Sequence, residues 1–478
     1  MLFNSISYLL FFPIVFLLYW SCCSKNVKIQ NLFLFFASYF FYGWWDWRFL
    51  SLIILCSLVN FSGGVLLGKT KNPKYRKLII VICCVISLGV LGIFKYYNFF
   101  ISSFVDLLHL MNIHIQVTIL HLILPVGISF YTFHTLTYTI EVYKRKFEPT
   151  KDIVAFALFV SIFPLAMAGP IERATNLLPQ LYKKRTLDYK EIVEGLQLVL
   201  WGFFMKIVVA DRLSIYVDSV YNNVENHFGI TLLLATVFFS FQIYCDFAGY
   251  SNIALGCGKL LGFKFINNFH RPYFAVNVTD FWKRWHISLS TWFRDYLYIP
   301  LGGNRCSTVR HYVNLMITFL VSGFWHGANW TFIVWGGLNG FFQIIGKIFT
   351  PFKNLSFNLY PLSVGKMKKV FDIVVTFGLI TFTWIFFRAS NVSEAFQIIS
   401  KIFTNPGTLF IDVTTMSYGL FAIVILIMKE VKDEFFANKF LFMNNAKITI
   451  RWATYMFLIV IILTCGVFDG GQFIYFQF

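Results

Sequence analysis

Two histidines have neighbours that would suit acid–base chemistry. His326 is the histidine of SGFWHGANWTF, within 311–346, a stretch that contains no Asp, Glu, Lys or Arg. His286 is the histidine of FWKRWHISLSTWF. A titratable ring in an apolar segment is costly unless it finds a partner, so it is a functional candidate by default. Apolar surroundings also favour the neutral imidazole, which is the form that a general base needs.

A packed, hydrogen-bonded structural histidine is the alternative for both positions. His286 lies beside charged residues and could simply bond to a neighbour. A zinc site built from both rings would need a third ligand, and the sequence offers none at a recognisable spacing. We therefore expect no metal site.

The neighbours of His326 suggest close packing around it. Asn329 could orient the imidazole. The tryptophans at 325, 330 and 335 could wall a tunnel for a short acyl group or a slim thioester arm, and they could equally anchor helices at the membrane interface. Small residues would let another helix or a ligand approach closely; they are Ser322, Gly323, Gly327, Ala328, Gly336, Gly337 and Gly340.

The segment around His286 is both basic and aromatic. Over 269–305 it is too charged for a lipid-facing span. Its apolar residues recur at helical spacing opposite basic ones, which predicts one amphipathic helix at the interface or dipping into a cavity. Asp280 is the expected N-cap, and Pro300 with the following glycine pair should end the helix. The apolar stripe is Trp282, Trp285, Leu289, Trp292 and Tyr296, and the basic face is Lys283, Arg284 and Arg294.

Two further places break a simple pattern of apolar spans. Asp246, in YCDFAGYSNIALG, lies within or just past an apolar span, as a buried partner for a basic residue or as a water-facing helix end. The segment 152–173 has basic loops before and after it and breaks at Pro164, Gly169 and Pro170. A re-entrant segment fits it better than a full crossing.

The composition places these elements in a lipid bilayer. The chain has 478 residues, of which 58% are hydrophobic and 13% charged, whereas soluble proteins carry about 25% charged residues. A membrane helix needs about 20 apolar residues. This length predicts about 12 spans, near 5–20, 30–45, 49–67, 78–97, 119–140, 192–212, 229–250, 311–326, 328–347, 370–388, 414–430 and 451–468.

Charge and cysteine usage fit a membrane protein of the cytoplasmic membrane. The formal net charge of +18 arises from basic residues in short loops between apolar runs, which marks the cytoplasmic side rather than a nucleic-acid surface. Both termini then lie outside. The first span lacks the basic start of a cleaved signal peptide, so we expect it to be retained. The nine cysteines include no C-x-x-C and suggest no disulfide framework.

Taken together, the motifs resemble the membrane-bound O-acyltransferase (MBOAT) superfamily, and within it the bacterial polysaccharide and alginate O-acetyltransferase branch, with the D-alanine transfer protein of teichoic acid modification as a relative. The resemblance implies an all-α polytopic fold of about 11–12 transmembrane helices plus re-entrant or interfacial helices around a central funnel. It also implies one domain over 1–478, with a core at 120–345, N-terminal helices at 1–118 and C-terminal helices at 366–478. The carrying motifs are PVGISFYTFHTLTY, FPLAMAGPIER, YCDFAGYSNIALG, FWKRWHISLSTWFRDYLYIPLGGNR and SGFWHGANWTF.

The resemblance also assigns roles. The histidine of the family's W-H-G motif corresponds to His326 as the catalytic residue, and the second family histidine corresponds to His286. We expect an acetyl group to pass from a cytoplasmic thioester, acetyl-CoA or another acyl donor, to an extracytoplasmic polysaccharide or a secreted partner acyltransferase. Basic side chains would hold the donor's phosphates. The expected donor- or substrate-binding residues are Lys283, Arg284, Arg294, Trp325, Asn329 and Asp246.

Other functions stay open at this point. The acyl group could be D-alanyl or another short acyl destined for a cell-wall polymer. A transporter or flippase for lipid-linked sugars would have the same architecture, although it would favour internal repeats, which the sequence lacks. A scaffold for polymer export would need neither histidine.

Overall fold

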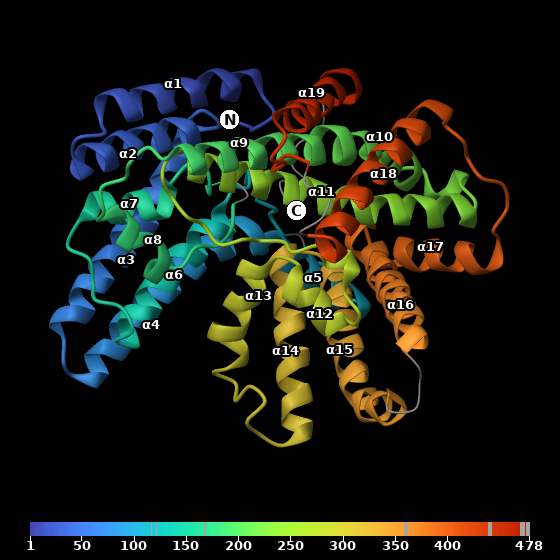
Figure 1. Cartoon of the computed structure of the whole chain (residues 1–478). Helices are drawn as coiled ribbons and strands as arrows, with labels where there is room; N and C mark the ends of the chain where they lie inside the picture. The colour runs from blue at the N-terminus through green and yellow to red at the C-terminus, as the bar shows by residue number, and fades with distance from the viewer. Residues whose placement is uncertain are drawn as a thin grey trace. The chain divides into compact units, whose positions relative to one another are not determined.

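Helices are the only regular secondary structure in the described part of the chain. The computed structural model describes residues 1–115, 117–120, 122–166, 169–357, 362–437, 442–468 and 474. Helices joined by loops make up these residues, with no strand among them (Figure 1). They divide into two compact units, 1–199 with 251–266 and 200–250 with 267–478. The single domain expected over 1–478 stays a prediction.

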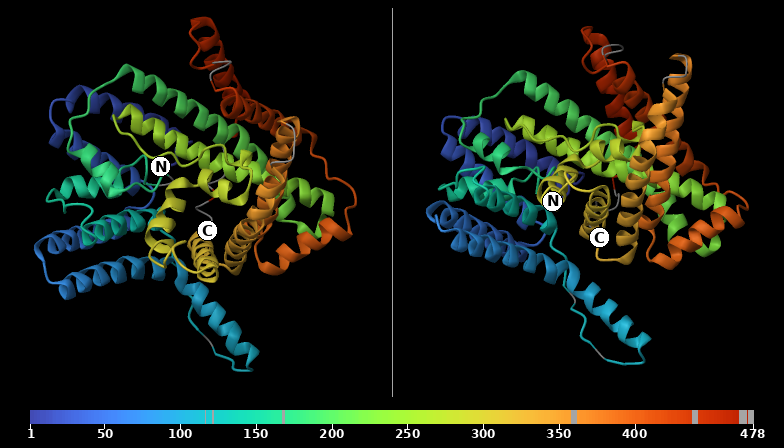
Figure 2. Two further views of the ribbon diagram at one scale, coloured as in Figure 1. Left: turned by 60° about the horizontal axis from the view of Figure 1, so that its bottom comes forward. Right: turned by 90° about the horizontal axis from the view of Figure 1, so that it is seen from below.

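The first unit begins with helices that have recognisable start signals. Asn72 caps α4 by accepting a hydrogen bond from the backbone N–H of Lys74, and Pro73 occupies the first helical position. Asp152 caps α7 in the same way. In both views of Figure 2, α3 and α4 lie side by side. The helices are α1 Ile6–Cys22, α2 Val27–Gly43, α3 Leu50–Lys69, α4 Pro73–Leu91, α5 Tyr97–Leu110, α6 Ile128–Tyr143, α7 Ile153–Ser161 and α8 Ala174–Leu181.

The second unit carries both candidate histidines. Its helix α14 packs along α15, and α15 packs along α16 (Figures 1 and 2). Two helices, α9 Tyr189–Phe203 and α11 Gly229–Leu260, contribute residues to both units. The other helices are α10 Asp211–Tyr221, α12 Val278–Arg284, α13 Ile287–Phe293, α14 Thr308–His326, α15 Trp330–Phe357, α16 Leu362–Arg388, α17 Val392–Thr404, α18 Val413–Phe435 and α19 Ile448–Cys465.

The protein is a multi-pass integral membrane protein. Within the described residues, eight helical stretches are long and apolar enough to cross a membrane. They correspond to eight of the twelve spans expected from the sequence. These stretches are Trp47–Lys69, Pro73–Leu110, Tyr189–Tyr221, Gly229–Leu260, Trp330–Phe349, Met367–Arg388, Val413–Phe435 and Ile448–Cys465.

The other four expected spans fall short for physical reasons. Helix α1 is apolar, but its 17 residues span only about 25 Å at 1.5 Å per residue, against a hydrocarbon core of about 30 Å. Helices α2 and α6, with 17 and 16 residues, are as short and also less apolar. The span expected from 119 is wrong at its start, because α6 begins only at Ile128, and His121 lies outside the described residues. Helix α14 is longer but opens with the polar residues Arg310, His311 and Asn314.

The segment 152–173 breaks as expected. Helix α7 has nine residues, about 14 Å of helix, which is less than half of a bilayer crossing. It ends at Ser161, three residues before Pro164, and α8 starts after Arg173. Met167 and Ala168, in the middle of FPLAMAGPIER, lie outside the described residues.

The single amphipathic helix expected from Asp280 to Pro300 is wrong. The segment forms α12, α13 and a π-helical turn, Arg294–Tyr298, with a break at His286. The helical stripe could not reveal this break, because its spacing continues across it. Asp280 is also not the N-cap, since α12 starts two residues earlier and the Asn277 side chain accepts the backbone N–H of Asp280.

Candidate functional site

His326 is the last residue of α14, at a sharp change in backbone direction. The chain becomes extended at Gly327, with φ −159°, and α15 starts three residues later. Asn329 makes this restart possible: its Oδ1 accepts the backbone N–H of Thr331 at 3.0 Å, and its Nδ2 donates to the carbonyl of Ser390 at 3.0 Å. The amide oxygen therefore serves the start of α15, and the amide nitrogen ties it to the loop after α16. The expected contact with the imidazole stays a prediction.

Glycines bring α14 and α15 into close contact beside this turn. A Cβ at Gly323 would lie 2.2 Å from the carbonyl oxygen of Phe332, and one at Gly336 would lie 2.3 Å from that of Phe319. Real Cβ atoms do not approach backbone so closely. The expectation that small residues here allow close helix packing is therefore confirmed for these two glycines.

Aromatic rings enclose His326, which is 2% exposed. Its ring centroid lies 5.0 Å from those of Trp325 and Trp335, and 5.6 Å from that of Phe387, all in steep edge-on geometry. Trp335 also stacks on Trp384 at 5.7 Å. Trp325 and Trp335 are thus buried against His326, whereas Trp330 is 55% exposed. The tunnel wall and the interface anchor both stay predictions.

His286 occupies a strained position between α12 and α13. Its backbone has φ 42° and ψ 55°, in the left-handed region that non-glycine residues rarely adopt. The side chain is 1% exposed. Its Nδ1 lies 3.1 Å from Oδ1 of Asn268, and Phe247 stands perpendicular to the ring at 4.6 Å. Nε2 has no hydrogen-bond partner among the described residues.

The two histidines share one neighbour. The Trp325 indole centroid lies 5.0 Å from the ring of His326 and 6.2 Å from the ring of His286. Burial lowers the pKa of His286 to about 3, so its ring is neutral at physiological pH. The structure therefore places both predicted histidines against one buried indole, in apolar and aromatic surroundings.

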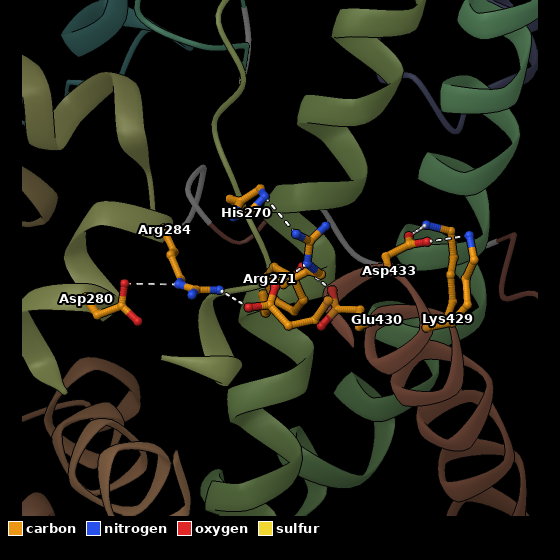
Figure 3. Close-up of polar contacts among 10 residues, drawn as sticks. His270, Arg271, Asp280, Arg284, Lys429, Glu430 and Asp433 are labelled. Carbon is orange, nitrogen blue, oxygen red and sulfur yellow. Dashed lines mark hydrogen bonds and ion pairs between the residues drawn. The ribbon is translucent and has the colours of Figure 1, made fainter. Parts of the chain in front are cut away.

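A charged cluster fastens the segment that leads to His286 (Figure 3). One carboxylate, Glu434 at the end of α18, bonds to Arg271 at 2.7 Å and to Arg284 at 3.0 Å. Arg284 also pairs with Asp280 at 3.1 Å. The backbone N–H of His270 donates to the carbonyl of Arg284. These bonds tie the loop before α12, the end of α12 and α18 together, two residues from the catalytic candidate.

A second contact joins α18 to the aromatic residues beside His286. Tyr244 of α11 donates its hydroxyl to Glu430. The Tyr244 ring packs at 6.1 Å from Trp285, the residue next to His286. Lys429 and Lys432 pair with Asp433 at 2.7 and 2.8 Å (Figure 3). The charges along α18 are therefore balanced locally.

The three residues of the expected basic binding face differ in exposure. Arg284 is partly buried in the ion pairs of Glu434 and Asp280. Lys283 and Arg294 are exposed, and Arg294 pairs with Asp295 at 2.8 Å. Two of the three cations are thus accessible to an anionic ligand.

Asp246 is a buried partner for a basic residue. Lys206 lies 2.7 Å from Asp246 and 2.6 Å from Asp211, and the side chains of all three are at most 5% exposed. The other carboxylate oxygen of Asp246 accepts the backbone N–H of Ile474 at 2.7 Å. This arrangement supports a packing role, and a role in binding substrate stays a prediction.

Sequence reasoning missed several residues of this site. Trp384 and Phe387 come from α16, far from either motif, and an aromatic at the end of an apolar span carries no signal of its own. Asn268 and Glu434 are polar residues in ordinary sequence surroundings. The described residues contain no group of three or more His, Cys, Asp or Glu side chains that could hold a metal ion.

Comparison with known proteins gives a consistent result. Residues 96–391 match the profile of the membrane-bound O-acyltransferase (MBOAT) family. The chain is 37% identical over 406 residues to the probable alginate O-acetylase AlgI of Pseudomonas aeruginosa, covering 84% of this chain and 75% of that protein. It is 34% identical over 418 residues to the peptidoglycan O-acetyltransferase of Helicobacter pylori, covering 81% and 77%. A teichoic acid D-alanyltransferase of Streptococcus thermophilus is 28% identical over 323 residues, covering 60% and 75%.

Proposed function

Because the chain belongs to the membrane-bound O-acyltransferase family, we propose that it moves an acetyl group from a cytoplasmic thioester to an extracytoplasmic glycan or to a partner acyltransferase. That it is a membrane O-acyltransferase of the alginate and peptidoglycan O-acetyltransferase type follows from the family and its relatives. The donor, the direction and the acceptor are the proposal. The observation that carries it is the enclosure of His326 and its shared neighbour with His286.

The chemistry assigned to His326 is general-base catalysis. A hydroxyl is a weak nucleophile, so its proton passes to an imidazole nitrogen of His326 as its oxygen attacks the thioester carbonyl. The new C–O bond forms, the C–S bond breaks, and the leaving thiolate takes up the proton. The aromatic enclosure excludes water, which would otherwise compete for the acyl group. His286, which is neutral, either positions the thioester or assists this proton transfer.

The donor proposed is acetyl-CoA or another acyl thioester. Lys283 and Arg294 are exposed cations flanking the His286 turn, and phosphates are ligands that such side chains bind well. The charged part of the donor then stays at the cytoplasmic surface while only the acetyl group moves onward. This division avoids carrying phosphate through lipid.

The acceptor proposed is a cell-surface glycan, reached directly or through a secreted partner acyltransferase. Relatives whose names state alginate and peptidoglycan acetylation support this class. The 28% identity to a teichoic acid D-alanyltransferase is the observation behind the second candidate, transfer of a D-alanyl group. Both fit a protein of the cytoplasmic membrane.

Oriented vesicles test the proposal. Inside-out vesicles that hold the protein, its acceptor glycan and the secreted fraction would receive labelled acetyl-CoA or a labelled D-alanyl carrier outside. We expect label from acetyl-CoA in the lumenal glycan or partner. Label from the D-alanyl donor alone would favour the second candidate. Glycan movement that needs no acyl donor would contradict acyl transfer and favour a flippase.

A further inference from the structure

Asn268 collects the hydrogen bonds of the whole turn at His286. It lies in the loop before α12 and is fully buried. Its Oδ1 is 3.1 Å from His286 Nδ1, 3.3 Å from the backbone N of Ser288 and 2.8 Å from Ser288 Oγ. Its backbone carbonyl accepts the N–H of Ile287 at 2.9 Å. One residue thus bonds to three consecutive residues.

These bonds hold an unfavourable backbone in place. A residue in the left-handed region costs of order 1 kcal/mol or more and persists only where its surroundings fix it. The bonds to Ile287 and Ser288 fix the two residues that follow His286. The ring itself is then fixed by Nδ1 and by Phe247, which stands against it at 4.6 Å.

The same contact selects one tautomer. Oδ1 of Asn268 accepts two hydrogens from Ser288, so it acts as an acceptor. Nδ1 of His286 must therefore carry the proton, and Nε2 keeps the lone pair. Because Asn268 is uncharged, it fixes this tautomer without favouring the imidazolium, as a carboxylate would.

We propose that Asn268 is the positioning residue for the transfer reaction, holding His286 as the neutral tautomer whose Nε2 lone pair faces the site. The inference rests on the proposed function, because it gives Nε2 a use there. A purely structural asparagine would stabilise the turn without setting the state of the ring. Asp and Ala at this position separate the two roles.

The activity test compares the pH dependence of acyl transfer. In N268A, kcat should fall about 10- to 100-fold, the range seen when a metal-ligating histidine loses its hydrogen-bonded support. In N268D, activity should return towards wild type at high pH, and the acidic limb of kcat should move up by at least about one pH unit, because a carboxylate favours the charged ring. N277A removes the α12 cap and should leave this limb unmoved.

A loss of kcat in N268A and N268D alike, with the acidic limb where wild type has it, would mean that Asn268 is structural only. If the variants do not fold, the tautomer of His286 can be measured directly in the wild-type protein. The ¹⁵N spectrum of wild-type protein labelled at histidine, with His286 assigned through H286Q, should show a protonated Nδ1 and a bare Nε2. A protonated Nε2 would overturn the inference, whether or not acyl transfer is detected. Wild-type protein without transfer activity but with the expected tautomer would count against the proposed function alone.

Discussion

The imidazole of His326 stands edge-on to the indole of Trp335, with ring centroids 5.0 Å apart and planes 86° apart. Trp335 is 1% exposed, so its ring limits where the imidazole can turn. Replacing it should therefore disturb catalysis through orientation.

For W335L we expect acyl transfer to fall by roughly 100-fold, because a displaced catalytic group can cost that much. The void should also lower stability by about 3 kcal/mol. Transfer rate and thermal midpoint in detergent check both effects. W330L is the matched control, since Trp330 is 55% exposed. Equal activity of the two variants would contradict the orienting role.

Neighbouring glycines on α15 should tolerate alanine very differently. A Cβ at Gly336 would meet the backbone of Phe319 at 2.3 Å, whereas one at Gly337 would meet only the Leu320 side chain at 3.5 Å. G336A should therefore cost about 1–3 kcal/mol and displace His326, while G337A should behave like wild type. Thermal midpoints of the two purified variants compare them directly. Equal midpoints would mean that α14 and α15 are not in close contact here.

Glu434 should be essential for the position of the His286 turn. E434Q leaves Arg271 and Arg284 without their shared carboxylate, which should cost about 2 kcal/mol. Proteolysis of the loop before α12 should accelerate with the loss of stability. D46N is the control, because it removes an ion pair whose arginine is 63% exposed and should leave the midpoint unchanged. A wild-type midpoint in E434Q would show that the cluster does not hold the turn.

His286 should make the protein less stable in mild acid. Its pKa of about 3 lies below the usual 6.5, so between these values the unfolded chain binds a proton that the folded chain does not. The contribution of His286 to the free energy of unfolding is complete above pH 6.5 and is lost as the pH falls towards 3. The thermal midpoint should therefore drop from pH 7.5 to 5 by more in wild type than in H286Q.

Comparing the pH dependence of the thermal midpoint in wild type and H286Q separates the effect of His286 from that of Glu172. Burial raises the pKa of Glu172 to about 7, so that this carboxyl makes stability fall as the pH rises between its ordinary value and 7. This opposite trend is common to wild type and H286Q and cancels in the comparison. Parallel pH curves for the two proteins would mean that His286 titrates normally in the folded state.

The sequence predicted the membrane class and the two histidines because both depend on local signals. Apolar runs of bilayer length identify most spans, and a histidine in an uncharged stretch stands out by itself. It could not predict the break at His286, because the apolar stripe on which the helix was based runs through it. Nor could it find Asn268, Trp384 or Glu434. Their roles arise only when distant segments pack together. For the same reason, the sequence could not decide whether Asp246 is buried against a basic residue or faces water.

The catalytic role of His326 is tested by measuring transfer of labelled acetyl groups by H326A in oriented vesicles, at protein levels and thermal midpoints matched to wild type. H311A, on the same helix, is the control. We expect H326A to lose transfer by at least about 100-fold and H311A to keep it. Transfer by H326A at the wild-type rate would contradict a catalytic role for His326 and leave it as a packed residue of the aromatic enclosure.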